Sequence, residues 1–224
     1  MSPATVLAVN TVAQIRPGYA GDTAIDKRPV AGPVAVDATG LVGDRQVARN
    51  HGGADRAVYA YATEDADWWA AELGRDLPVG LIGENLRTSG LGVSSAQIGE
   101  RWRIGTALFE VRMPRTPCAN LSLRLGIPRF HVRFNATGRV GAMLGVLECG
   151  SLRAGDPVTV EFRPRHGVTV ADLAVGPDAA AVRALLDSGV PLASTVQSTA
   201  RRVLRREAAG PSTADTAATG TATG

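Results

Sequence analysis

The chain has 224 residues, 45% hydrophobic and 20% charged, which is enough apolar sequence for one large domain or a domain with a small annex. Its formal net charge of +3 gives no reason to expect a nucleic-acid-binding protein, and two cysteines are too few for a disulfide framework. No apolar run approaches the roughly 20 residues that span a bilayer, and the N-terminus does not resemble a signal peptide, so we expect a cytoplasmic protein.

Short runs rich in β-branched residues, separated by glycine turns, predict strands over most of residues 1–165. These runs lack the regular alternation with helices that is typical of a parallel sheet, so we expect a mainly β fold, as a barrel or a sandwich. Residues 99–112 are expected to form a hairpin with Gly105 and Thr106 in its turn. The other expected strands cover residues 5–9, 34–36, 57–62, 140–147 and 158–162.

One helix is expected to interrupt these strands, over residues 63–73. Thr63 suits its N-cap, and Gly74 suits its stop. Trp68 and Trp69 lie on this helix, and adjacent helical residues do not both face inward. We therefore expect one tryptophan in the core and the other partly exposed.

A second helical region is expected after the last strand. Thr169 and Asp172 have the spacing of a capping box, and Pro177 suits the first turn of another helix. Residues 189–191 separate that helix from a third one, which ends near residue 207. The sequence therefore predicts a mainly β domain over residues 1–165 and a three-helix extension over residues 166–208.

The end of the chain carries two compositional features. Residues 209–224 consist almost entirely of Ala, Thr, Gly, Ser and Pro, and are expected to be disordered because they cannot bury enough apolar surface. Just before them, four arginines stand at helical spacing: Arg201, Arg202, Arg205 and Arg206. No aromatic residues are interleaved with these arginines, so a solvated helix face explains them better than nucleic-acid binding.

Cys118 is the strongest chemical candidate in the chain. Pro114 and Pro117 stiffen the segment before it, so we expect the thiol to be held in one place at the end of a strand. The charge of Arg115 favours the thiolate, which is the form that attacks electrophiles or binds soft metals. The alternative is that Cys118 is a small buried hydrophobic residue. We interpret Cys149 as structural.

A glycine-rich segment with charged neighbours is a candidate anion site. Gly52 and Gly53 could turn successive backbone N–H groups toward a phosphate, and Arg56 could bind it bidentately. His51 stands beside them, although its spacing from the other histidines does not predict a zinc site. The alternative is an ordinary tight turn.

Three other residues are candidates for ligand binding. Lys27 is the single lysine among 24 basic residues, which suggests that its position requires a compact ammonium. Glu84 and Asn85 could bond the edge of a heterocycle or satisfy the backbone of their own loop.

Several of these segments occur in an order that resembles a known family. They read TAIDKRPV (23–30), GLVGD (40–44), HGG (51–53), AVY (57–59), GENL (83–86), IGE (98–100) and PRTPC (114–118). Together, over residues 5–162, they resemble the MOSC domain family, named for the C-terminal domain of molybdenum cofactor sulfurases. The C-terminal helices resemble the three-helix extension of one bacterial branch of that family.

The resemblance implies a bent β-barrel with a pocket for the pterin-based molybdenum cofactor (Mo-molybdopterin). Cys118 would be the catalytic residue and metal ligand. The cofactor-binding residues would be Lys27, His51, Gly52, Gly53, Arg56, Glu84, Asn85, Arg115 and Arg139. A soft thiolate suits a metal already held by dithiolene sulfur.

The resemblance further implies an oxidoreductase that reduces N-hydroxylated compounds, with a role in detoxifying base analogues. No flavin, haem or iron–sulfur motif occurs in the chain, so we expect electrons to come from a separate reductase partner. One alternative is a non-redox carrier that holds a persulfide sulfur on Cys118. Another is a module that binds a phosphorylated ligand, with Lys27 as an anion site or as the imine-forming amine for pyridoxal phosphate.

The chain departs from the family pattern at four positions. Gly145 stands where related chains carry an arginine, and Ala142 and Met143 replace aromatic residues just before it. Ala48 stands where an acidic residue is common. Arg139 does match, and we expect it to supply part of the missing charge.

Overall fold

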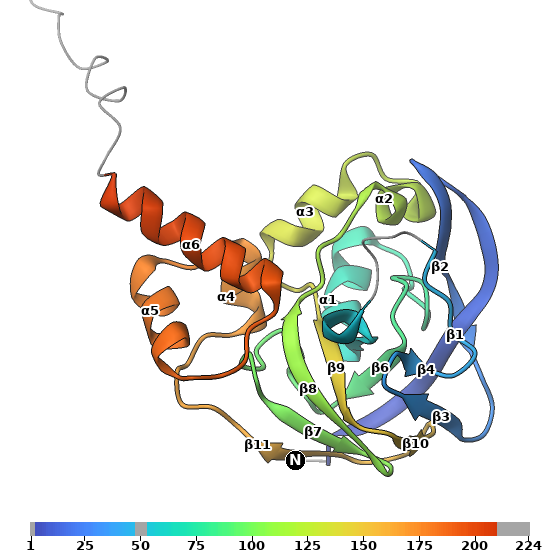
Figure 1. Ribbon diagram of the computed structural model, residues 1–224. Helices are drawn as coiled ribbons and strands as arrows, with labels where there is room; N and C mark the ends of the chain where they lie inside the picture. The colour runs from blue at the N-terminus through green and yellow to red at the C-terminus, as the bar shows by residue number, and fades with distance from the viewer. Residues whose placement is uncertain (1–2, 48–52, 210–224) are drawn as a thin grey trace, which may run out of the picture.

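The computed structural model describes residues 3–47 and 53–209, and within these ranges strands predominate up to residue 162 (Figure 1). The predictions for His51, Gly52, Ala48 and the tail over residues 210–224 lie outside the described residues. The strands are β1 (Thr5–Gly18), β2 (Gly21–Pro29), β3 (Val34–Asp37), β4 (Gly40–Leu41), β5 (Val58–Ala62), β6 (Leu86–Ser89), β7 (Arg101–Ile104), β8 (Ala107–Pro114), β9 (Ala142–Glu148), β10 (Gly150–Leu152) and β11 (Val158–Phe162). The helices are η1 (Ala54–Arg56), α1 (Thr63–Leu73), α2 (Ala119–Leu125), α3 (Phe130–Ala136), α4 (Val170–Val175), α5 (Ala179–Asp187) and α6 (Ser194–Ala208).

Eight strands form one bent sheet in the order β11-β7-β8-β9-β5-β6-β1-β2, in which the β5–β6 pair is parallel and the other pairs are antiparallel. The start of β1 also contacts the start of β11, because Thr5 and Pro157 form an isolated bridge and Val6 N donates to Asp156 O at 2.9 Å. The sheet therefore curls so that strands distant in its order meet. The mainly β class is confirmed, and closure into a barrel stays a prediction. A smaller sheet, β10-β3-β4, lies beside it.

The core is built around aromatic side chains from α1 and α3. Trp69 is fully buried and stacks on Phe134 with ring centroids 5.6 Å apart, and it meets Phe130 edge to face. Trp68 is half-buried, as predicted for one member of the pair. These contacts fix α1 against α3, and Phe134 also stacks on Tyr61 of β5 with ring centroids 5.8 Å apart, which attaches the pair to the sheet.

The structure corrects several element predictions. Thr63 is the first helical residue and Ala62 is the N-cap, so the N-cap prediction was wrong, whereas Gly74 ends α1 in the left-handed conformation as predicted. The prediction of a single helix before residue 165 was also wrong, because α2 and α3 lie between β8 and β9. Strand β2 was not predicted. The hairpin of β7 and β8 is confirmed, with Ile104 paired to Ala107 across the turn.

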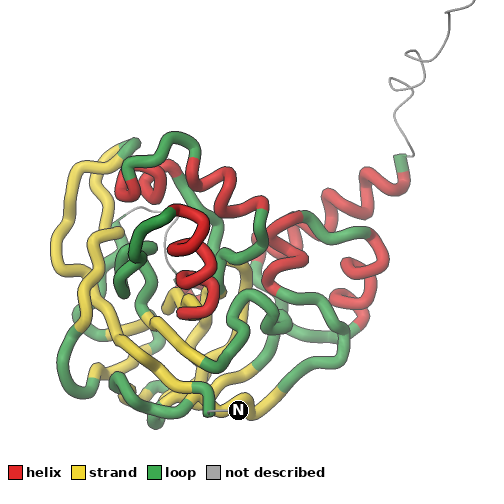
Figure 2. Tube along the Cα trace, turned by 180° about the vertical axis from the view of Figure 1, so that it is seen from behind, coloured by secondary structure: helices red, strands yellow, loops and turns green. Residues whose placement is uncertain are grey.

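The three C-terminal helices are present and gather at one side of the sheet (Figures 1 and 2). Thr169 and Asp172 form the predicted capping box of α4. Pro177 precedes α5, whose N-cap is Asp178, so its predicted place in the first turn was wrong. No helix in the described part of the chain is long and apolar enough to cross a membrane. The division into separate domains stays a prediction.

Candidate functional site

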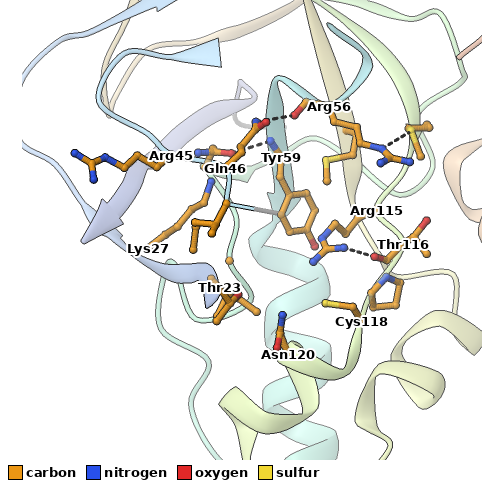
Figure 3. A pocket seen from close by; sticks show the side chains of 18 of the residues that line it. Thr23, Lys27, Arg45, Gln46, Arg56, Tyr59, Arg115, Thr116, Cys118 and Asn120 are labelled. Atoms are coloured by element: carbon orange, nitrogen blue, oxygen red, sulfur yellow. Dashed lines mark hydrogen bonds between the residues drawn. The ribbon is translucent and has the colours of Figure 1, made fainter. Parts of the chain in front are cut away.

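A cavity of about 410 Å³ lies where β2, β5, β8 and β9 meet the 45–47 segment and the start of α2 (Figure 3). Its wall combines cationic side chains, two methionines, one tyrosine and one cysteine. It is lined by Asp22, Thr23, Ala24, Ile25, Lys27, Arg45, Gln46, Val47, Arg56, Tyr59, Gly83, Asn85, Met113, Arg115, Thr116, Pro117, Cys118, Asn120, Met143 and Thr195. Five predicted site residues therefore share this cavity: Lys27, Arg56, Asn85, Arg115 and Cys118.

Cys118 occupies the junction between β8 and α2. It has extended backbone angles (φ −123°, ψ 173°), and its carbonyl accepts the Leu121 N–H at 2.9 Å in the first turn of α2. The segment after β8 is fixed to the sheet because Arg115 N donates to Gly141 O at 3.1 Å. The thiol is half-buried, free of any disulfide, and part of the cavity wall. Cys118 thus lies four residues beyond the end of β8 rather than at the strand end, and its role at the site stays a prediction.

Helix α2 is held in turn by a buried carboxylate on β2. Asp26 accepts hydrogen bonds from Arg16 at 2.8 Å and from Arg124 of α2 at 3.1 Å, and Arg28 pairs with it at 3.3 Å. Burial alone would raise the pKa of Asp26, but its arginine partners outweigh burial and hold the pKa below its ordinary value. Asp26 thus fastens the helix whose N-cap is Cys118.

Lys27 forms a buried ion pair at the cavity wall. Its Nζ lies 2.6 Å from Asp44 Oδ2, and both side chains are about one-tenth exposed or less. Asp44 is oriented by two further bonds, from Val12 N at 2.8 Å and from Asn85 Nδ2 at 2.8 Å. Burial lowers the pKa of Lys27, and the Asp44 carboxylate opposes that shift. The contact with Asp44 therefore holds Lys27 Nζ in one position beside the cavity.

Arg115 lies against the ring of Tyr59, with its guanidinium carbon 5.6 Å from the ring centroid, and bonds the carbonyl of Thr116. Tyr59 is buried and donates from its hydroxyl to Val140 O at 2.8 Å, and burial raises the pKa of Tyr59. Arg56 Nε donates to Met113 Sδ at 3.5 Å. In Figure 3, Lys27 approaches from the left, Tyr59 lies in the centre, and Cys118 lies below Arg115.

Three predicted site residues lie outside the cavity wall. Glu84 is fully buried, and its Oε1 accepts from Gly80 N at 2.8 Å and from Arg87 Nε at 2.9 Å, so it holds its own loop. Gly53 is exposed and precedes η1. Arg139 bonds Asp65 at 2.7 Å and does not supply charge to the cavity as expected.

Arg139 also stacks on Trp68, with its guanidinium carbon 4.8 Å from the ring centroid. Gly145, which stands where related chains carry an arginine, is in contact with a different arginine. A Cβ at that position would lie 2.9 Å from Ala54 O and 3.2 Å from Arg112 Cγ, so the space is already filled. Arg112 crosses Gly145 and bonds Asp55 at 2.8 Å.

Several residues in or behind the cavity wall were not predicted. Asp44 does not line the cavity, but it pairs with the wall residue Lys27 across 17 residues of sequence, a contact with no local signal. Tyr59 belongs to a buried strand and looks like core in the sequence. Thr195 comes from α6 and donates to Met113 Sδ at 3.3 Å, so the C-terminal extension reaches the cavity. No pattern in the sequence indicated this contact.

The chemistry available in the cavity follows from this wall. Arg45, Arg56, Arg115 and Lys27 offer donors to an anion, and Cys118 offers one soft sulfur ligand or nucleophile. Within the described ranges no cluster of three His, Cys, Asp or Glu side chains is placed to hold a metal ion. The wall therefore suits an anionic molecule that presents an electrophilic or thiophilic atom to the thiol.

The chain is similar to several known proteins. The model of the MOSC domain matches residues 47–159. A protein of Gibberella moniliformis named "Reductase" is 37% identical over 146 residues, which are 63% of this chain and 26% of the relative. Protein YflK of Bacillus subtilis is 33% identical over 150 residues, which are 66% of this chain and 68% of YflK. The chain thus spans about a quarter of the first relative and two-thirds of the second.

The crystal structure of YiiM from Geobacillus stearothermophilus superimposes with a TM-score of 0.75 at 27% identity, covering 90% of this chain and 100% of that one. The superposition covers 90% of this chain, whereas residues 1–165 make up less than three-quarters of it. The structural similarity therefore extends into the C-terminal helices.

Proposed function

The chain belongs to the MOSC domain family, and on that premise we propose that it is a molybdenum-cofactor-dependent oxidoreductase that reduces N-hydroxylated compounds. The observation that carries the proposal is the placement of Cys118, a free thiol in the wall of a cavity that also holds four cationic side chains. We propose Cys118 as the protein ligand of the metal. The name of the Gibberella relative supports a reductive reaction, although the matched stretch is a minor part of that protein.

The residues present fit the cofactor by size and by chemistry. A volume of about 410 Å³ lies within the range of small-molecule sites. A metal held by dithiolene sulfur needs few ligands from the protein, and the one cysteine is soft enough to be such a ligand. The Lys27 ammonium and the guanidinium groups of Arg45, Arg56 and Arg115 would hold the phosphate.

The chain's own residues set up the site before any ligand binds. Asp44 and Asn85 fix the position of Lys27 Nζ, and the bonds of Asp26 fix α2 and hence Cys118. When bound, the cofactor supplies the two-electron redox chemistry. The overall reaction consumes two electrons and two protons, breaks the N–O bond, and gives an N–H product and one water.

The proposal includes the expected barrel and the expected cellular setting of the reaction. The curled sheet would be the bent barrel of the family, closed through the contact between the starts of β1 and β11. The chemistry would take place in the cytoplasm with electrons from a separate reductase. Both cysteines being free fits a reducing compartment.

The test is cofactor analysis of the full chain, produced in a host that synthesises the molybdenum cofactor. We expect molybdenum and an oxidisable pterin in equal amounts, and turnover of an aromatic hydroxylamine when reduced methyl viologen supplies electrons. Mass spectrometry that finds a persulfide on Cys118 without metal would instead indicate a sulfur carrier. An imine absorbance that is lost in Lys27→Arg would indicate pyridoxal phosphate binding. Either of these results would overturn the proposal.

A further inference from the structure

Helix α6 presents a strongly basic face to solvent. Arg201, Arg202, Arg205 and Arg206 are all exposed and follow one another at positions i, i+1, i+4 and i+5, so they share one side of the helix. The opposite side carries the buried residues Val196 and Ala200. These four arginines, together with Ser198 and Ala209, line one concave surface, which we term the basic face.

The basic face is not neutralised within the protein. None of its four arginines forms an ion pair with any residue in the ranges 3–47 and 53–209. Glu207, the one acidic residue of α6, is bonded to Arg183 of α5. Like charges four residues apart on a helix repel each other. The arrangement therefore costs α6 stability and would be relieved by an external anionic surface.

The same helix reaches the cavity at its other end. Thr195, in the first turn of α6, lines the cavity and donates to Met113 Sδ at 3.3 Å. Arg205 follows ten residues later, which is about 15 Å along a helix axis. Figures 1 and 2 show α6 extending from the strand region with its C-terminal half away from the sheet. The four arginines of the basic face therefore lie about 9–17 Å along the helix axis from the cavity residue Thr195.

From this geometry we propose that the basic face docks the acidic surface of an electron-donating flavoprotein of the flavodoxin type, an inference that rests on the proposed reductase function. The reduced flavin of such a partner supplies the two electrons that break the N–O bond, while two protons complete the N–H product and water. Complementary charges at the rim of an interface raise the association rate and orient the partners.

A protein partner fits the basic face better than a nucleic acid does. Helix α6 contains no aromatic residue that could stack on a base, and its four arginines span about 8 Å of helix axis rather than following a long phosphate backbone. A compact acidic patch on a small protein matches this extent. Because α6 also lines the cavity, a redox partner bound to the basic face could serve the reaction there, whereas a bound nucleic acid would have no role in it.

The test measures binding of an acidic FMN-containing flavodoxin to the full chain by calorimetry, at low and at physiological salt. We expect R201E/R205E to weaken binding by about tenfold or more, and the wild-type affinity to fall as salt rises. R201K/R205K keeps the charge and should stay within about twofold of wild type. The matched control R153E/R165E makes the same change in net charge at two other exposed arginines and should also stay within about twofold.

Activity measurements separate this proposal from the proposed function. Turnover with reduced methyl viologen bypasses the partner, so R201E/R205E should keep that activity while losing flavodoxin-supported turnover. Unchanged flavodoxin affinity in R201E/R205E, or equal losses in both charge-reversal variants, would overturn the docking proposal. So would arginine-dependent binding of a DNA oligonucleotide without flavodoxin binding. Absence of viologen-supported turnover would count against the reductase function alone.

Discussion

The cationic residues of the cavity and those of α6 have opposite structural settings. Lys27 is buried and paired with Asp44 at 2.6 Å, and Arg115 lies against Tyr59 and bonds a backbone carbonyl. Arg201 and Arg205 are exposed and unpaired among the described residues. Charges that are fixed by partners can position a ligand, whereas exposed and unpaired charges act mainly through attraction at a distance.

This difference predicts that substitutions in the cavity change chemistry or stability strongly, while substitutions on α6 change partner association.

The largest expected effect is at Cys118. We expect Cys118→Ala to abolish viologen-supported turnover with the fold retained, because the residue is a half-buried N-cap whose carbonyl, rather than its thiol, bonds α2. Cys149→Ala, at an exposed position, should stay within about twofold of wild type, since surface changes away from such sites are nearly neutral. Equal unfolding of both variants in circular dichroism would instead make Cys118 a packing residue.

Breaking the buried ion pair should have the next largest effect. Lys27→Met leaves the Asp44 carboxylate buried without its cation, which typically costs about 3–5 kcal/mol of the free energy of unfolding. Arg206→Met on α6 should cost less than about 0.5 kcal/mol. Urea denaturation measures both. The double variant Lys27→Met/Asp44→Asn should recover part of the loss, and a cost for Lys27→Met as small as that of Arg206→Met would contradict the distinction between the two regions.

A pH-dependent effect is expected at Asp26. Because its pKa lies below the ordinary value in the folded protein, its ionised form stabilises the fold above the unfolded pKa, and this contribution is lost as pH falls through the folded pKa. Asp26→Asn should therefore lower the free energy of unfolding at neutral pH by about 1–3 kcal/mol. The difference from wild type should shrink as the solution is acidified. A difference that is independent of pH would show that the arginine contacts do not depend on the charge.

The smallest expected effect is on α6 and has the opposite sign. Arg201→Glu replaces repulsion from Arg205 by attraction at i,i+4, with the acidic residue on the N-terminal side and outside the last turn, so the free energy of unfolding should rise by about 0.2–0.5 kcal/mol while flavodoxin binding weakens. Thermal denaturation and calorimetry on the same sample measure both quantities. A loss of stability in this variant would mean that the arginine has a structural role.

The fold was predictable where residue patterns are local and strong. The β7–β8 hairpin and the capping box of α4 follow from turn and cap residues that lie close together in the chain. Strand β2 does not alternate in polarity, because the adjacent residues Asp26 and Lys27 are both buried and serve ion pairs rather than the apolar core. Helices α2 and α3 have seven residues each, too few to show a helical period.

The reactive residues of the candidate site could be predicted from the sequence, but the set of residues that the fold brings together around them could not. Cys118 and Arg115 stood out because the prolines and the charge lie in one short segment. Thr195 reaches the cavity only through the tertiary fold, where it bonds Met113, and Asp44 supports the wall residue Lys27 from behind through a contact that no local pattern indicates. Arg139 matched the family pattern, but its guanidinium bonds Asp65 and does not line the cavity.

X-ray absorption at the molybdenum edge would test directly whether Cys118 is a metal ligand, on wild type and on Cys118→Ala and Cys149→Ala loaded in the same host. We expect one fewer sulfur ligand to molybdenum in Cys118→Ala than in wild type, and an unchanged number in Cys149→Ala. An identical sulfur count in all three proteins would contradict this expectation.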